Sequence, residues 1–169
     1  NVVDIVEQGY DLAIRVGALA PSSLRARKLA ESPRALVASP EYLAKRGSPG
    51  DLDDLKNHNC IMQGGGQNWL FQLPDKRQKK IAISGSFQTN SGEAVAIAAL
   101  DGLGIAMKSL WDVQDHLESG RLKILLPELR ILPDWDIWAV RPASPVLPAR
   151  TKLFTSFLEE KFKTLPKRP

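Results

Sequence analysis

The segment Asn90–Glu93 stands where an alternating apolar stretch ends and a strongly apolar helical stretch begins. Asn90 can cap the helix, with Glu93 at the third helical position of a capping box. Gly92 has no side chain, so a ligand can approach the free backbone N–H groups, and a helix N-terminus attracts carboxylates and phosphates. The segment therefore predicts either an anion-binding turn or an ordinary capped helix start, and these residues by themselves favour the ordinary start.

Other residues with reactive side chains give weaker patterns. Arg15 lies in an apolar strand, where it can reach a ligand carboxylate or, as the more common arrangement, pair with a neighbouring acid. His58 and Cys60 are too few to bind a metal, which needs three or four ligands. The glycine-rich stretch 64–68 lacks the Lys-Ser or Lys-Thr of a phosphate loop. We therefore expect no catalytic residue, no metal and no cofactor.

Composition narrows the class of protein. The chain has 169 residues, 43% of them hydrophobic and 25% charged, as in ordinary soluble globular domains. A net charge of +4 is mildly basic and well below that of a dedicated nucleic-acid binder. The sequence has no apolar run of membrane-spanning length, no signal-peptide pattern at its start and a single cysteine, Cys60. These features favour a cytoplasmic location without a membrane partner.

The first third of the chain alternates helical and extended patterns at short spacing. The expected elements are a helix over 1–9, strands over 11–17 and 34–38, a helix from the cap Ser39 to Gly47, and a short helix over 50–58. Such alternation is typical of β-α-β units and predicts a mostly parallel sheet. Ser39 is the expected N-cap because Pro40 follows it at the first helical position.

Extended and helical patterns also alternate in the rest of the chain. The expected strands cover 59–63, 79–89, 104–107, 121–126 and 136–140, and the expected helices begin at Asn90 and Ser109 and include 153–162. The helix over 94–100 is apolar nearly all round, which predicts burial on both sides. Extended connectors near 59–63 and 136–141 suggest two α/β lobes: 1–60 with 141–169, and 61–140. Such folds bind ligands in a cleft at the carboxyl ends of strands.

The order of several motifs resembles the effector-binding domain of LysR-type transcriptional regulators. The motifs are "VVDIVEQGYDLAIRVG", "RKLAESPRALVASPEYLAKRG", "LDDLKNHNCI", "NSGEAVAIAALDGLGIAMKSLWDV", "ESGRLKILLPE" and "IWAVRP", followed by a C-terminal helix. The resemblance covers the chain to about residue 162. It implies a two-lobed fold like that of type 2 periplasmic binding proteins, with two crossover strands and a small effector in the cleft between the lobes.

The resemblance also implies which residues of this chain face the effector. In lobe one, these are Arg15, Val16, Gly17 and Ser39; the first crossover would present Gln63; and lobe two would present Asn90, Ser91, Gly92 and Met107, with Lys108 a further candidate. The helix N-terminus and Arg15 suit a carboxylate, although a polar neutral molecule also fits.

The family pattern implies further parts of a longer protein. A strand, a helix and another strand precede "VVDIVEQG" in the family, so lobe one is expected to be incomplete and the chain N-terminally truncated. The parent protein is expected to be a homo-oligomer, dimer or tetramer, that binds DNA through an N-terminal winged helix-turn-helix absent from this chain. The alternative function is a solute-binding protein of a transport system with the same fold. An enzyme is disfavoured because no acid–base pair or partnered nucleophile is present.

Overall fold

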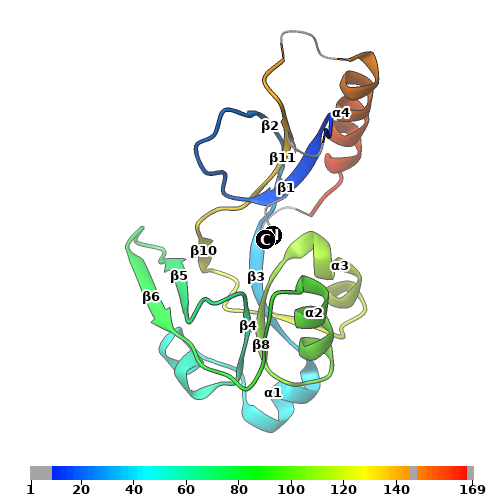
Figure 1. Ribbon diagram of the computed structural model, residues 1–169. Coiled ribbons are helices and arrows are strands. Elements are labelled where there is room, and N and C mark those ends of the chain that lie inside the picture. The colour runs from blue at the N-terminus through cyan, green and yellow to red at the C-terminus, as the bar shows by residue number, and fades with distance from the viewer. Residues whose placement is uncertain (1–8, 145–147, 167–169) are drawn as a thin grey trace. The chain divides into compact units, whose positions relative to one another are not determined.

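The structure is a computed structural model that describes residues 9–144 and 148–166 (Figure 1). The helix expected over 1–9 therefore lies outside the described residues, apart from Gly9. The described residues form two compact units: unit 1 contains 9–32, 134–144 and 148–166, and unit 2 contains 33–133. No described helix has the length and apolarity that a membrane span requires.

These units have different bounds from the two lobes that the sequence suggested. The first passage between units follows Ser32, and the prediction of a crossover at 59–63 is wrong. Strand β4 (Cys60–Gln63) is instead an interior strand of unit 2 that pairs with a neighbour on each side. Its first three residues are buried, as a central strand requires and a connector does not. The second passage, at 133/134, falls just before the connector expected at 136–141.

Unit 1 is built on a small antiparallel sheet with the strand order β1-β11-β2. The strands are β1 (Ala13–Gly17), β2 (Arg25–Glu31) and β11 (Asp136–Arg141). Helix α4 (Ala149–Phe162) packs beside β2 (Figure 1). Strands β1 and β11 and the last helix confirm elements expected from the sequence, whereas β2 was missed because its arginines and lysine interrupt the apolar pattern.

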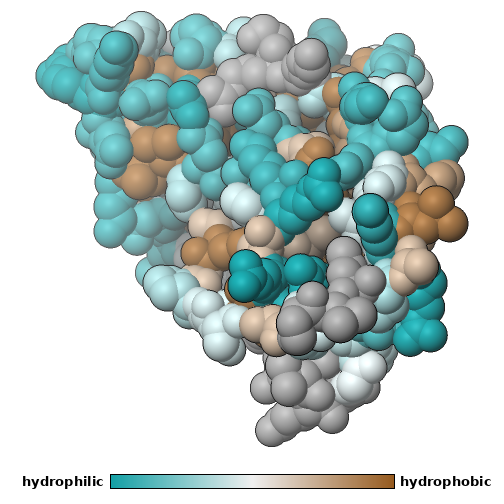
Figure 2. All heavy atoms as spheres, turned by 90° about the horizontal axis from the view of Figure 1, so that it is seen from above, coloured by the Kyte–Doolittle hydropathy of each residue, from teal (hydrophilic) through white to brown (hydrophobic). Residues whose placement is uncertain are grey.

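Helix α4 leaves most of its large apolar side chains exposed. Leu153, Phe154 and Phe157 are exposed, Leu153 to 74%. The buried residues of the helix are instead Thr151 and Thr155. Figure 2 shows one face of the chain, where hydrophobic residues form separate patches among hydrophilic ones. The side of α4 that carries Thr151 and Thr155 therefore faces the unit 1 sheet, and Phe154 and Phe157 face outward.

Unit 2 contains a mixed five-stranded sheet with the order β7-β4-β8-β3-β9. Its strands are β3 (Arg34–Ala38), β4, β7 (Gln88–Thr89), β8 (Ile105–Ser109) and β9 (Lys123–Leu125). Strand β4 runs parallel to β7 and β8, but β3 runs antiparallel to β8 and β9. The expectation of a mostly parallel sheet is wrong because the chain enters unit 2 through an antiparallel strand.

A second, smaller sheet belongs to unit 2. Strands β10 (Arg130–Leu132), β5 (Asn68–Gln72) and β6 (Gln78–Ala82) pair antiparallel in that order. The single strand expected over 79–89 is therefore two strands, because the chain leaves this sheet after Ala82 and joins the larger one at β7. The 75–80 segment includes the turn between β5 and β6.

The larger sheet has a buried apolar cluster on each face, beneath the elements that pack on that face. One face carries α2 (Gly92–Leu100) and α3 (Leu110–Glu118), and its buried cluster is Val37, Ile61, Val95, Ala96, Ala99, Ala106, Val113 and Leu122 (Figure 1). The other face packs against α1 (Pro40–Arg46), η1 (Asp53–Asn57) and the smaller sheet through a cluster that includes Tyr42, Leu55 and Phe71. Ile97 of α2 is 51% exposed, so this helix is buried on one side only.

Asn59 joins three chain segments at the start of β4. Its side-chain Nδ2 donates to the Leu103 carbonyl at 2.6 Å and to Ser86 Oγ at 3.1 Å, and its Oδ1 accepts from the Ser86 N–H at 2.7 Å. Two glycines pack against the same backbone. A methyl group on Gly104 would overlap the Asn59 carbonyl oxygen, and one on Gly85 would overlap the carbonyl of Cys60. The loops before β7 and β8 therefore approach β4 as closely as backbone atoms allow.

We expect Gly104→Ala to lower the free energy of unfolding by roughly 1–3 kcal/mol or more, because rigid backbone atoms must move to admit the methyl group. The matched control is Gly66→Ala, since a methyl group there meets no atom within 4 Å. Urea unfolding of both variants measures the difference. Equal stability of the two variants would show that the Asn59 contact has room to relax.

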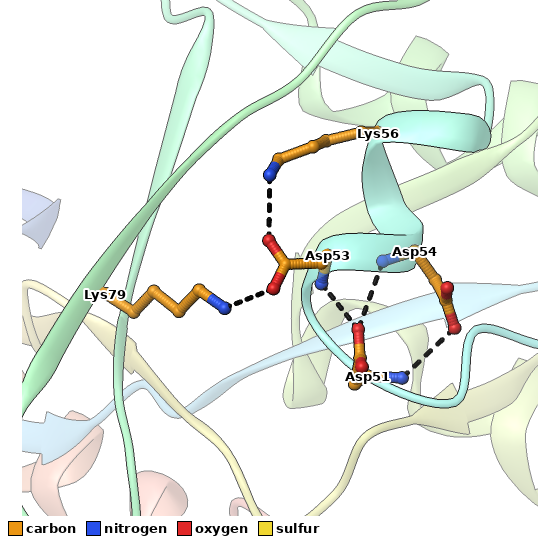
Figure 3. Close-up of polar contacts among 5 residues, drawn as sticks. All are labelled: Asp51, Asp53, Asp54, Lys56 and Lys79. Carbon is orange, nitrogen blue, oxygen red and sulfur yellow. Dashed lines mark hydrogen bonds and ion pairs between the residues drawn. The ribbon is translucent and has the colours of Figure 1, made fainter.

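Asp53 joins η1 to the smaller sheet through two lysines. Its carboxylate accepts from Lys56 Nζ at 2.8 Å and from Lys79 Nζ of β6 at 2.6 Å (Figure 3). Hydrogen bonds from Lys56 and then Lys79 lower the pKa of Asp53 to about 2. Asp51 caps the same turn by accepting from the N–H groups of Asp53 and Asp54. The carboxylate of Asp51 thus accepts the first N–H groups of this turn, although the turn is a 3-10 helix whose N-cap position is Leu52.

The carboxyl signal of Asp53 should titrate near pH 2 by ¹³C NMR. Since its pKa is lower folded than unfolded, its contribution to stability is complete above the unfolded pKa of about 3.9 and is lost as the pH falls through about 2. In Lys79→Met, the midpoint should move up towards the ordinary aspartate value. An unchanged midpoint in that variant would contradict the Asp53–Lys79 contact.

Candidate functional site

The carboxyl ends of three parallel strands meet at one edge of the larger sheet in unit 2. Strand β4 ends at Gln63, β7 at Thr89 and β8 at Ser109. Since β4 runs parallel to both neighbours, these ends lie at the same edge. Ligands of open α/β sheets bind outside such ends. The residues at this edge therefore form the candidate site.

Helix α2 begins directly after β7 at this edge. Its N-cap is Ser91 rather than Asn90, because the Ser91 hydroxyl accepts from the Ala94 N–H at 3.2 Å. Glu93 consequently occupies the second helical position, and the expected capping box does not form. Within residues 9–144 and 148–166, no hydrogen bond accepts the N–H of Gly92 or Glu93. These two donors remain available to a ligand, as at other helix N-termini.

Lys108 of β8 places a buried ammonium group beside the start of α2. Its side chain is 3% exposed, its Nζ donates to the Gly92 carbonyl at 2.6 Å, and it forms an ion pair with Asp112. A methyl group on Gly92 would lie 3.3 Å from this Nζ and 3.4 Å from the side-chain nitrogen of Gln63. Gln63, Gly92 and Lys108 therefore converge from three different elements.

The chemistry of this group is that of a hydrogen-bond donor set. It contains two backbone N–H groups, the Gln63 amide and the Lys108 ammonium, which has three protons and two acceptors among the described residues. Asp112 balances the charge of Lys108, and Glu93 adds a negative charge nearby. The site can therefore bind a carboxylate or a polar carbonyl through directed hydrogen bonds, with little net charge of its own.

Two other residues expected at the site lie elsewhere in unit 2. Met107 faces the opposite side of the sheet from Lys108, where its Sδ accepts from Arg34 Nη1 at 3.2 Å. Ser39 follows β3, which runs antiparallel to β8, so it stands at the opposite edge of the sheet. There its buried hydroxyl caps α1 by accepting from the Tyr42 N–H at 3.2 Å. The helix start predicted at Ser39 is confirmed, and the cap uses this hydroxyl.

The remaining expected residues, Arg15, Val16 and Gly17, belong to unit 1 and form the end of β1. Arg15 pairs in register with Trp138 of β11. The Gly17 carbonyl accepts from Trp138 Nε1 at 3.1 Å, and Gly17 has a φ of 130°, which favours glycine. Val16 is exposed. These three residues are grouped with each other, and Gln63, Asn90, Ser91 and Gly92 are grouped in unit 2.

Sequence reasoning missed Asp112 at this site and gave Lys108 only as a further candidate. The signal was a lysine in the apolar strand 105–109, where a charge needs a partner, with an aspartate four residues later. Asp112 was interpreted instead as part of a helix cap with Ser109, and Ser109 does stand at the N-cap position of α3.

His58 and Cys60 are buried structural residues. Tyr42 Oη lies 3.0 Å from His58 Nδ1, and burial lowers the pKa of His58. Burial also raises the pKa of the Cys60 thiol to about 12, which disfavours the reactive thiolate. Among the described residues, no three His, Cys, Asp or Glu side chains are placed to hold a metal ion.

Comparison with known proteins identifies the class of fold and then the family. The chain resembles solved structures of regulatory proteins, which have the fold of type 2 periplasmic binding proteins. The regulatory domain of CrgA from Neisseria meningitidis superposes with a TM-score of 0.82 at 32% identity, covering 96% of this chain and 80% of that one. Full-length AphB, a virulence activator of Vibrio cholerae, gives 0.81 at 27% identity over 95% of this chain and 54% of its own.

Sequence relatives give the same result. The model of the LysR substrate binding domain matches residues 1–163, and the chain belongs to this family. The transcriptional regulator DmlR of Escherichia coli K12 is 37% identical over 165 residues, which cover 96% of this chain and 53% of DmlR. The chain spans about half the length of the curated relatives it matches. The chain is therefore an effector-binding regulatory domain and not an enzyme, as the motif order predicted.

Lys108→Met should lower the free energy of unfolding by about 1–3 kcal/mol, because it leaves Asp112 and the Gly92 carbonyl without their buried partner. The estimate is below that for a fully buried pair, since the Asp112 side chain is 35% exposed. Lys45→Met is the matched control, because it removes an exposed pair with Glu41 at the same four-residue separation in the sequence. Chemical denaturation compares them, and a Lys108→Met as stable as the control would refute a structural role for the buried ammonium.

Proposed function

We propose that this domain senses a small carboxylate through the unit 2 edge formed by Gln63, Ser91 and Gly92, with Lys108 as a supporting residue. The observation that carries the proposal is the convergence of two open backbone N–H groups with the Gln63 amide and the Lys108 ammonium. A carboxylate has two oxygens with several lone pairs, so it can accept from more than one of these donors at once.

Residues from both units would contribute to effector recognition. Arg15, Val16 and Gly17 at the end of β1 remain proposed ligand residues of unit 1, and Asn90 remains one of unit 2. Ser39 and Met107 are weaker candidates, since one caps α1 and the other lies on the opposite sheet face from Gly92. In this proposal, unit 1 and unit 2 correspond to the two lobes of the family, with bounds at 32/33 and 133/134 in place of those expected from the sequence.

The effector would act by changing the equilibrium between conformations of a longer protein. An effector shifts such an equilibrium only by its difference in affinity for the two states. We propose that the parent is a cytoplasmic homo-oligomer, dimer or tetramer, that binds DNA through a winged helix-turn-helix outside this chain. The relatives DmlR and TtdR are named as HTH-type transcriptional regulators, which supports this proposal over a transport function.

Ser91→Asp tests the carboxylate site without removing the helix cap. Aspartate is a good N-cap, so the fold should be retained, but its charge would repel a carboxylate at the adjacent N–H groups. We expect carboxylate affinity to fall by at least about tenfold, a change of roughly 1.4 kcal/mol in binding free energy. The measurement is a thermal-shift screen of acetate, succinate, citrate and benzoate, followed by calorimetric titration of any acid that raises the melting temperature.

Ser91→Asn is the matched control because asparagine has the same shape and also caps helices well, but carries no charge. Retained affinity in Ser91→Asn with loss in Ser91→Asp supports the site. Equal affinity of the two variants for an acid that binds the unsubstituted chain would refute the placement of the carboxylate at α2. Binding of neutral metabolites alone would refute the carboxylate while keeping the sensor function.

A further inference from the structure

Unit 1 contains a cavity of about 180 Å³ between its sheet and α4. The lining residues come from the segment before β1, from β2, from β11 and from α4: Leu12, Arg25, Ala26, Arg27, Ala139, Arg141, Lys152 and Thr155. Ala139 and Thr155 are buried, whereas Arg25, Arg27 and Lys152 are exposed. An engineered apolar cavity of about 150 Å³ in another protein admits benzene, so this space suits a small organic molecule.

The cavity is strongly basic. Arg25 and Arg141 are direct partners across the β2–β11 pairing, and Arg27 stands opposite Ala139 in the same register. Like charges placed directly opposite each other on neighbouring strands destabilise a sheet. Lys152 adds a fourth cation from α4. An anion between the two opposed guanidinium groups would turn this repulsion into attraction.

Few acidic side chains compensate these cations. Arg27 pairs with Glu159, with its Nη2 at 3.0 Å from Glu159 Oε2. Arg141 Nη1 donates to the Pro142 carbonyl at 3.1 Å. In the part of the chain that the structure describes, neither Arg25 nor Lys152 forms an ion pair.

The acid next to the cavity lining is already engaged. Asp11 precedes the lining residue Leu12 and accepts from Arg150 Nη2 at 2.9 Å. Glu159 and Asp11 therefore have cationic partners of their own, and three of the four cations around the cavity have no acidic partner among the described residues.

We infer that this basic cavity of unit 1 is a second ligand site, which binds a small organic acid with its carboxylate between Arg25 and Arg141. Guanidinium groups present pairs of N–H donors that match the two oxygens of a carboxylate. The apolar side chains of Leu12 and Ala139 provide contacts for the carbon skeleton, and for this reason an organic acid fits better than an inorganic ion. The site uses no residue of the unit 2 edge, so it stands independently of the function proposed above.

Arg25→Gln tests this inference on the 169-residue chain. In chloride buffer, the variant should be as stable as the unsubstituted chain or more stable, because it removes the repulsion with Arg141. Calorimetry with succinate or benzoate should show binding at this site that is at least about tenfold weaker in the variant than in the unsubstituted chain, with any binding at the unit 2 edge unchanged. In ¹H–¹⁵N spectra, the acid should shift the amide signals of Ala139 and Thr155.

Lys80→Gln is the matched control, since it removes the same charge from an exposed position of unit 2. Loss of binding in Arg25→Gln with retention in Lys80→Gln supports the second site. Equal loss in both variants would show that only the overall charge matters and would overturn the inference. A chain that binds inorganic phosphate but neither organic acid would also overturn it. Arg25→Gln should not change binding at the unit 2 edge, which is the binding that Ser91→Asp should weaken. The two proposals can therefore fail separately.

Discussion

The fold of unit 2 depends on the contact between Asn59 and the loops that precede two neighbouring strands. One amide side chain binds both Leu103 and Ser86, and Gly85 and Gly104 bring the backbones into direct contact with β4. This contact aligns β4, β7 and β8 at their amino ends. Because strands of fixed length and direction then run side by side, it also determines where their carboxyl ends come together.

The position of the candidate site follows from strand direction. Gln63 and the start of α2 follow parallel strands, so they reach the same edge as the end of β8, where Lys108 lies on the α2 face. Ser39 follows an antiparallel strand and is carried to the other edge. Met107 is only one residue from Lys108, but successive side chains of a strand point to opposite faces, which places it beside Arg34. The reversed direction of β3 therefore separates Ser39 from the site, and a shift of one residue along β8 separates Met107 from it, although the motif order had grouped these residues.

The two units offer anions different environments. At the unit 2 edge, the Lys108 charge is balanced by Asp112, so recognition depends on directed hydrogen bonds from a rigid helix start. In unit 1, Arg25 and Arg141 face each other without a described acid between them, so attraction depends on uncompensated charge. Binding at the second site should therefore be the more sensitive to salt, because partly exposed charges are screened at physiological ionic strength.

Much of this protein was determined by local sequence. The Ser39-Pro40 start and Gly47 end of α1 and the strand over 34–38 were predicted, because caps and apolar patterns act over a few residues. The ordered motifs also identified the family. Tertiary structure alone decided that β4 is a central strand rather than a connector, that Ser91 replaces Asn90 as the cap, and that Lys108 meets Gly92. It also decided that Arg25 stands opposite Arg141. These outcomes depend on strand direction and register between segments far apart in the chain, which no local pattern encodes.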